Sequence, residues 1–99
     1  MNLNKMMKNL QKMQSELQTT IDALEIEAAS GGGMVTARMN GKKQLIGLTI
    51  APEVVSGDDV DLLQDLVLAA VNEAGKKVDA AVQDATQGMA GGLGLPGMP

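Results

Sequence analysis

The stretch from Ser30 to Ile50 reads SGGGMVTARMNGKKQLIGLTI, and it decides the fold. After three glycines, apolar and polar residues alternate from Val35 to Met39, as in a strand with one buried face. Asn40-Gly41 is the preferred pair for a type I′ hairpin turn, so we expect a return strand from Leu45 to Ile50. Gly47 within it predicts a bulge, or a bend that divides the strand in two. The stretch therefore predicts an antiparallel sheet of two or three strands.

The residues before this stretch predict one long helix. Residues 3–29 contain neither Gly nor Pro, and the glycine triplet ends the helix. Their apolar residues follow a heptad repeat, the pattern of a helix that packs against a partner helix. The repeat comprises Leu3, Leu10, Leu17 and Leu24, with Met6, Met13 and Thr20 between them. At about 1.5 Å per residue the helix spans roughly 40 Å. We expect the glycines to form a hinge that lets it fold back on the sheet.

The residues after the sheet predict a second long helix. Asp58 is a good N-cap, and the acids that follow it place negative charge where the helix dipole favours it. Apolar residues recur at steps of three and four from Val60 to Ala85, so the helix should reach Gln87 and span roughly 45 Å. Gly75 weakens it by about 1 kcal/mol relative to alanine. Residues 88–99 are rich in Gly, Met and Pro, carry no charge, and predict a flexible tail.

The order helix, antiparallel sheet, helix makes residues 1–87 a single α+β domain. A compact chain of this length has a radius of gyration of about 13 Å, too small to cover two such long helices. The open sheet edges also need a partner. We therefore expect an elongated homodimer. Its predicted interface residues are Leu10, Met13, Leu17, Leu24, Leu63, Val67 and Val71.

The composition excludes most catalytic chemistry. The chain has no Cys, His, Trp, Tyr or Phe, which removes disulfides, most metal and haem ligand sets and the usual nucleophile–base pairs. The acids Glu53, Asp58, Asp59 and Asp61 lack the spacing of a calcium loop. We expect no enzymatic activity, cofactor, metal site or small-molecule substrate. The longest apolar run, Leu66 to Val71, is far shorter than the roughly 20 residues that span a bilayer, so we expect a cytoplasmic protein without a membrane segment.

Positive charge gathers in blocks, although the net charge is −4. Residues 1–15 hold three lysines and no acid, and residues 35–52 hold three further cations and no acid. Lysines in the first turns of a helix oppose its macrodipole, and Lys8 and Lys12 repel each other at a spacing of four residues. Lys5, Lys8 and Lys12 form a stripe of positive charge that lowers the stability of the helix. Such a stripe favours an anionic partner over a merely solvated helix face.

The remaining cations leave alternatives open. Arg38, Lys42 and Lys43 lie near the predicted hairpin tip, where cations either contact phosphates or keep exposed strands from aggregating. Lys77 has a partner in Glu73 one helical turn earlier, whereas Lys76 is freer. The candidate phosphate contacts are Lys5, Lys8, Lys12, Arg38, Lys42, Lys43 and Lys76.

Five segments in this order resemble one known family. They are Asn4-Lys5-Met6-Met7-Lys8, Ser30–Val35, Met39–Lys42, Ile50–Val55 and the acidic-to-apolar run Asp59–Ala74. Together they resemble the YbaB/EbfC family of bacterial nucleoid-associated proteins over nearly the whole chain. The resemblance implies an α-β-β-β-α protomer with a three-stranded sheet and a tweezer-shaped homodimer. It also implies binding to double-stranded DNA in the nucleoid, chromosome compaction and effects on transcription, but it carries over no residue-level reading motif.

A second interpretation belongs to another class of function. The Leu and Met seams of the helices and the acidic net charge are also typical of a protein-interaction adaptor whose lysines only solvate its surface. Partners that remain bound after nuclease treatment would favour the adaptor over the DNA-binding protein.

Overall fold

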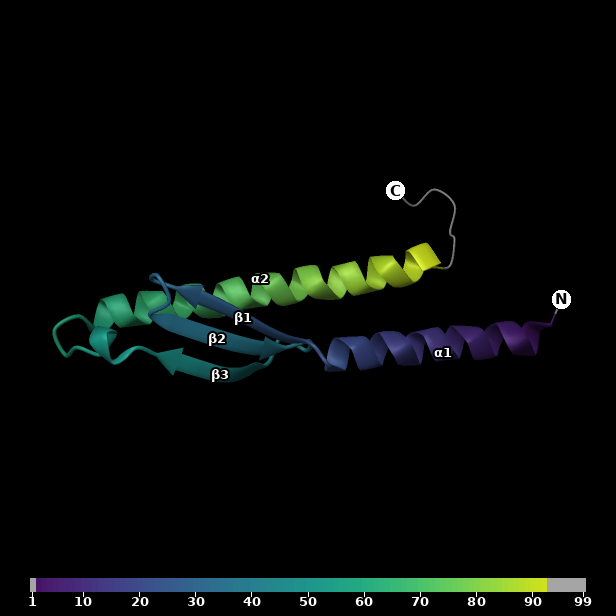
Figure 1. The fold of residues 1–99 in the computed structure, drawn as a ribbon, viewed down its shortest axis with the longest axis horizontal. Coiled ribbons are helices and arrows are strands. Elements are labelled where there is room, and N and C mark those ends of the chain that lie inside the picture. Colours follow the sequence, from purple (N-terminus) through teal and green to yellow (C-terminus); the bar gives the residue numbers. More distant parts are fainter. Residues whose placement is uncertain (1, 93–99) are drawn as a thin grey trace.

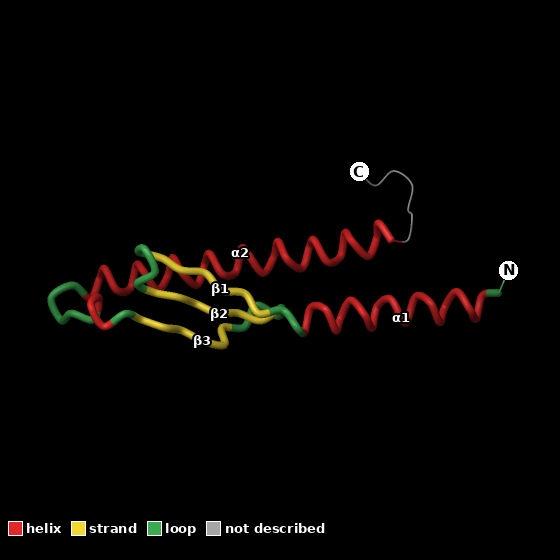
Figure 2. Tube along the Cα trace, in the orientation of Figure 1, coloured by secondary structure: helices red, strands yellow, loops and turns green. Residues whose placement is uncertain are grey.

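The computed structural model describes residues 2–92, with side chains through Gly88, and shows an elongated α+β fold (Figures 1 and 2). Its elements are α1 (Leu3–Asp22), β1 (Glu25–Ser30), β2 (Val35–Asn40), β3 (Leu45–Ile50), the 3-10 helix η1 (Pro52–Val54) and α2 (Val60–Gly92). The principal extents are 70 × 25 × 15 Å and the radius of gyration is 19.2 Å. A compact chain of this size would have a radius of about 13 Å. The predicted class and three-stranded sheet are confirmed, and the single chain is itself elongated.

The first helix is shorter than predicted. α1 ends at Asp22, and Glu25–Ser30, which the helix prediction included, form strand β1 instead. Strand pairing with β2 outweighs the helix propensity of Glu and Ala in this segment, because tertiary context overrides weak local preference. Leu24 therefore lies in the connection after α1 and not in a helical seam. The predicted folding back is also wrong, because α1 projects from one end of the sheet (Figure 1).

Both hairpin turns differ from the prediction, and the geometry expected at Asn40-Gly41 occurs at the glycine triplet instead. Gly31, Gly32 and Gly33 all have positive φ, and Gly33 N donates to Ser30 O at 3.1 Å. The glycine triplet is thus the β1–β2 turn, with positive φ at both central positions as in a type I′ turn. Gly41 has no positive φ, so the type I′ prediction for the β2–β3 turn is wrong.

The sheet is antiparallel throughout, in the order β1-β2-β3. Its register pairs Ala37 with Ala28 on one side and with Leu48 on the other. Arg38 pairs with Gly47 and Met39 with Leu45, so Ile46 is the extra residue of a bulge. The predicted bulge is confirmed, but it does not divide β3, and the third strand comes from β1.

Helix α2 covers one face of the sheet and makes the core. The sheet contributes small and medium side chains that let the helix approach closely, and the helix contributes two alanines and a valine to the same core. The buried residues are Ala28, Val35, Ala37, Met39, Ala70, Ala74 and Val78. Ser30 Oγ donates to Leu66 O at 2.6 Å, which ties the end of β1 to the helix. α2 contacts β1 and β2 most extensively, leaving the β3 edge less covered.

Both ends of α2 differ from the prediction. Asp59, not Asp58, caps the helix, because Asp59 Oδ1 accepts a hydrogen bond from Leu62 N at 3.1 Å. The helix continues to Gly92, so residues 88–92 of the predicted flexible tail are helical. The rest of that predicted tail, residues 93–99, lies outside the described residues.

Candidate nucleic-acid interface

The three lysines of α1 are exposed on a helix that projects away from the sheet (Figure 1). Within residues 2–92, Lys5, Lys8 and Lys12 make no ion pair, and the first turn of α1 contains no acid. Asn2 caps the helix by accepting a hydrogen bond from Lys5 N at 3.2 Å. The helix therefore presents three unneutralised charges against its own dipole.

Arg38 lies in the middle of β2 and not at the hairpin tip. Its side chain occupies the sheet face opposite α2, where its Nη1 lies 3.6 Å from Glu25 Oε1. It pairs across the strands with Glu27, a second acid on that face, and it passes over Gly47 on the other side. A Cβ placed on Gly47 would lie 2.9 Å from Arg38 Nε, so this glycine leaves room for the guanidinium. Nearby acids therefore offset the charge of Arg38.

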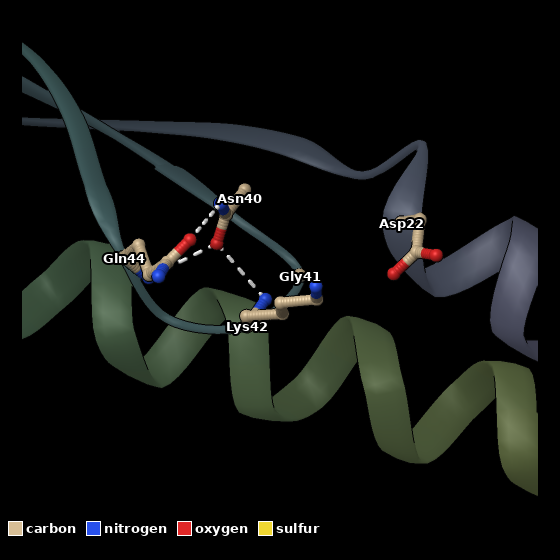
Figure 3. A pocket seen from close by; sticks show the side chains of 5 residues that line it. All are labelled: Asp22, Asn40, Gly41, Lys42 and Gln44. Carbon is tan, nitrogen blue, oxygen red and sulfur yellow. Dashed lines mark hydrogen bonds between the residues drawn. The ribbon is translucent and has the colours of Figure 1, made fainter.

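The β2–β3 loop holds Lys42 and Lys43 in different ways, and Figure 3 shows Lys42 beside Asn40 and Gln44. Asn40 Oδ1 accepts hydrogen bonds from the backbone N–H groups of Lys42 and Gln44, each at 3.0 Å, and Lys43 N donates to Asn40 O at 3.1 Å. Lys43 has a φ of 60°, the left-handed residue that closes such a turn. Its Nζ lies 3.2 Å from Asp79 Oδ2 on α2. Lys42 remains exposed, without an ion pair in the described part of the chain.

Lys76 lies beside this loop on α2. Together with Lys43 it lines a hollow of about 400 Å³ that also includes Gly75 and Asp79. A Cβ on Gly75 would lie 3.4 Å from Lys43 Cε, an ordinary van der Waals contact, so the lysine stem passes directly over this glycine. Lys77 donates to Glu27 O at 3.3 Å instead of pairing with Glu73 as predicted. The structure thus brings Lys43 and Lys76 together, and places the α1 lysines and Arg38 elsewhere.

The loop also meets the end of α1. Gly41 lies against the backbone carbonyl of Ile21, and a shallow pocket of about 120 Å³ opens between Asp22 and the loop (Figure 3). α1 and the cationic loop are therefore in direct contact, even though the lysines of α1 extend away from this junction.

Charge is separated along the long axis of the molecule. Residues 53–65, at the η1 end, hold Glu53, Asp58, Asp59, Asp61 and Asp65 and no cation. The three α1 lysines lie beyond the opposite end of the sheet (Figure 1). Exposed charges are screened beyond about 10 Å at 0.1 M salt. The molecule is 70 Å long. The acids at the η1 end therefore exert only weak repulsion on an anion that approaches the N-terminal end of α1.

An apolar groove lies between β3 and α2. It is lined by Ile50, Leu63, Gln64, Val67, Leu68 and Val71 and has a volume of about 470 Å³. Leu68 is 60% exposed, and the neighbouring edge strand leaves Leu45, Ile46 and Leu48 exposed. The groove includes three of the predicted interface residues, on α2. Leu68 and the exposed β3 residues are not among the predicted interface residues, because the sequence does not show that α2 lies mainly over β1 and β2 and leaves them uncovered.

A second apolar surface runs along α1, which has no buried residue. Leu10 is exposed, whereas Met13 and Leu17, nearer the sheet, are half-buried. Leu3, Met6 and Met7 continue the exposed stripe toward the N-terminus. Among residues 2–92, neither helix is long and apolar enough to cross a membrane, and no three acidic side chains cluster as metal ligands do.

Comparisons with known proteins place the chain among DNA-binding relatives. The model of the YbaB/EbfC DNA-binding family matches residues 1–93. A nucleoid-associated protein of Koribacter versatilis (Acid345_1974) is 53% identical over 96 residues, covering 97% of this chain and 95% of the relative. A nucleoid-associated protein of Alkaliphilus metalliredigens is 45% identical over 100 residues, covering 98% and 88%.

The fold has a counterpart among solved structures. The uncharacterized protein HP0035 of Helicobacter pylori aligns with a TM-score of 0.74 at 25% identity, over 89% of this chain and 92% of that one. Sequence and fold agree over nearly the whole length, and the chain belongs to the YbaB/EbfC DNA-binding family, which is not a family of enzymes.

Proposed function

We propose that this nucleoid-associated protein binds double-stranded DNA as a homodimer, through lysine contacts to phosphates and with little sequence preference. In this proposal it organises the chromosome in the cytoplasm and thereby affects gene expression. The observation that carries it is the separation of charge: within the described residues Lys5, Lys8 and Lys12 make no ion pair, and they lie on a projecting helix, far from the acids at the η1 end. Lysines in such a position neutralise phosphates and release counterions.

Two features support weak sequence preference. Arginine paired with guanine is the commonest base-specific contact, and the only arginine of this chain, Arg38, already pairs with Glu25. The five cations whose side chains make neither an ion pair nor a hydrogen bond within the described residues are lysines, which act on phosphates as point charges. These lysines are Lys5, Lys8, Lys12, Lys42 and Lys76. Phosphate contacts position a protein on DNA without reading its sequence.

The apolar groove between β3 and α2 supports the homodimer. Monomeric proteins rarely leave a contiguous apolar surface uncovered, and a two-fold axis would present the same surface twice. We propose that Leu63, Val67 and Val71 pack against a second copy, and that the stripe of Leu10, Met13 and Leu17 completes the contact. A dimer carries six α1 lysines on one particle.

A salt-titrated gel shift with unrelated duplexes of equal length tests the proposal. If about six phosphates are neutralised, log K falls against log salt with a slope near −5, and unrelated duplexes bind alike. Replacing the three α1 lysines with glutamate abolishes binding and leaves a folded dimer. A flat salt response, or equal binding by the triple variant, contradicts phosphate contact by α1.

The exposed apolar surfaces favour a second candidate, the protein-interaction adaptor. In that case the groove beside Leu68 docks another protein and the lysines only solvate the surface. Pull-down of the intact protein before and after nuclease treatment separates the two. Partners lost with the nucleic acid support the DNA-binding protein, and partners that persist without it support the adaptor.

A further inference from the structure

Helix α1 contacts α2, and its half-buried residues, Met13, Leu17 and Ile21, all lie in its C-terminal half. It has no buried residue, and the chain leaves it through Ala23, whose N–H donates to Thr19 O at 3.0 Å. Leu24 N then donates to Ile21 O at 3.1 Å. The last turn of α1 therefore ties the helix to the sheet, and together with the contact to α2 it sets the direction of the helix.

Gly41 of the β2–β3 loop lies directly against that last turn. A Cβ on Gly41 would overlap the carbonyl oxygen of Ile21 and lie 2.9 Å from its carbonyl carbon. These are backbone atoms, which cannot rotate away as a side chain can. Gly41 has no positive φ, so the turn itself would accept another residue there. What requires glycine at this position is the close approach of α1.

The loop is anchored on its other side. Lys43 pairs with Asp79 and its stem crosses Gly75, while Asn40 bonds to two backbone N–H groups within the loop. A side chain at position 41 would therefore push against α1, the less firmly held of the two neighbours. The loop acts as a stop against which the helix rests.

From this geometry we infer that Gly41 is a positioning residue for DNA binding, since it sets the direction of α1 and with it the placement of the α1 lysines relative to Lys42 and Lys76. The inference rests on the proposed function. Lys5 is 16 residues from Ile21, which is about 24 Å along the helix. A tilt of about 10° at Gly41 would thus move Lys5 by about 4 Å, which is comparable to the roughly 3.4 Å rise along the DNA axis from one phosphate of a strand to the next. Two linked contact surfaces gain affinity only when both can engage at once.

The first test measures the helix direction without DNA. The chain has no cysteine, so single cysteines at the exposed positions Asn9 on α1 and Gln83 on α2 carry spin labels uniquely. Labelled protein is mixed with an excess of unlabelled protein, so that only distances within one protomer are measured. Gly41→Ala shifts the distance between the labels, whereas Gly57→Ala, where a Cβ meets nothing within 4 Å, leaves it unchanged. An unchanged distance in Gly41→Ala overturns the inference.

The second test measures DNA binding by the same variants. Gly41→Ala weakens binding about tenfold and makes the salt slope shallower, because fewer phosphates are contacted together. The oligomeric state stays that of the wild type, and Gly57→Ala binds as the wild type does. A shifted label distance with wild-type affinity and slope also overturns the positioning role. Failure of the wild type to bind any duplex defeats the proposed function instead, and the label distance still reports on Gly41.

A further variant keeps the inference testable if Gly41→Ala does not fold. Asp79→Asn removes the charge that anchors Lys43 at an exposed position, so the stop against α1 is loosened. The distribution of label distances becomes broader and the salt slope shallower. A distribution as narrow as that of the wild type shows that the loop does not hold α1, and overturns the inference.

Discussion

Lys43 Nζ lies 3.2 Å from Asp79 Oδ2, and this ion pair joins the tip of the β2–β3 hairpin to the middle of α2. Both side chains are more than half exposed, so the pair itself is worth little, about 0.2–1 kcal/mol. Its importance is geometric, because it holds the loop that touches both helices. Lys43 is also a predicted phosphate contact, and at this junction an acid of another element faces its charge.

Exchanging the two charges tests whether the pair anchors the loop. Lys43→Asp places two acids together and Asp79→Lys places two lysines together, so each lowers the free energy of unfolding by about 1 kcal/mol or less. The double variant Lys43→Asp/Asp79→Lys recovers most of the stability lost in Lys43→Asp. Urea unfolding of the four proteins gives these values. If the double variant is as unstable as the sum of its parts, the two side chains do not interact in solution.

The core between α2 and the sheet should tolerate no larger side chain at its alanines. Ala70 is fully buried, so Ala70→Leu overfills the core and lowers the free energy of unfolding by about 1–3 kcal/mol. The adjacent Ala69 is exposed, and Ala69→Leu changes it by less than about 0.5 kcal/mol. Urea unfolding compares the two variants. Equal losses at both positions would mean that α2 presents a different face to the sheet.

Residue patterns predicted α2 and the two strands β2 and β3 because each has a clear period. The residue pattern of Glu25–Ser30 did not predict strand β1, because Glu and Ala also favour helix. The partner strand of β1, β2, comes later in the chain, so local sequence does not reveal the pairing. A third strand is predicted both by a division at Gly47 and by the resemblance to the family, but neither places it at Glu25–Ser30. The glycines at 31–33 correctly predict the end of a regular element, but they do not indicate whether that element is a helix or a strand.

The candidate site could be predicted in composition but not in arrangement. The lysine stripe of α1 follows from helical spacing alone, and the structure keeps it exposed. The pairings of Arg38 with Glu25 and of Lys43 with Asp79 join residues 13 and 36 positions apart, which no local period reveals. The contact of Gly41 with Ile21 likewise depends on where α1 ends. Only the tertiary contacts therefore show which cations pair with acids and which lysines make no ion pair in the described residues.

The apolar groove should control dimer formation. Leu68 is 60% exposed in the protomer, so Leu68→Asp costs the isolated protomer little but places a charge in the proposed interface. We expect the dimer to weaken by about 2 kcal/mol or more, as for a central interface residue. Sedimentation over a range of concentrations measures the effect. Leu62→Asp is the control, because Leu62 is exposed on α2 but does not line the groove. Equal dissociation constants for the two variants would place the interface elsewhere.

Single lysines should differ in their effect on the salt dependence of DNA binding. Lys8→Gln removes a charge that nothing in the described residues neutralises, so the salt slope becomes shallower by about 0.9 for each copy that contacts a phosphate. Lys77→Gln removes the same charge from a lysine that bonds to Glu27 O, and we expect the slope to stay near that of the wild type. Gel shifts at several salt concentrations measure both slopes with the same duplex. Because the two variants have equal net charge, a general electrostatic effect would change both slopes alike, whereas contact through α1 changes only the first.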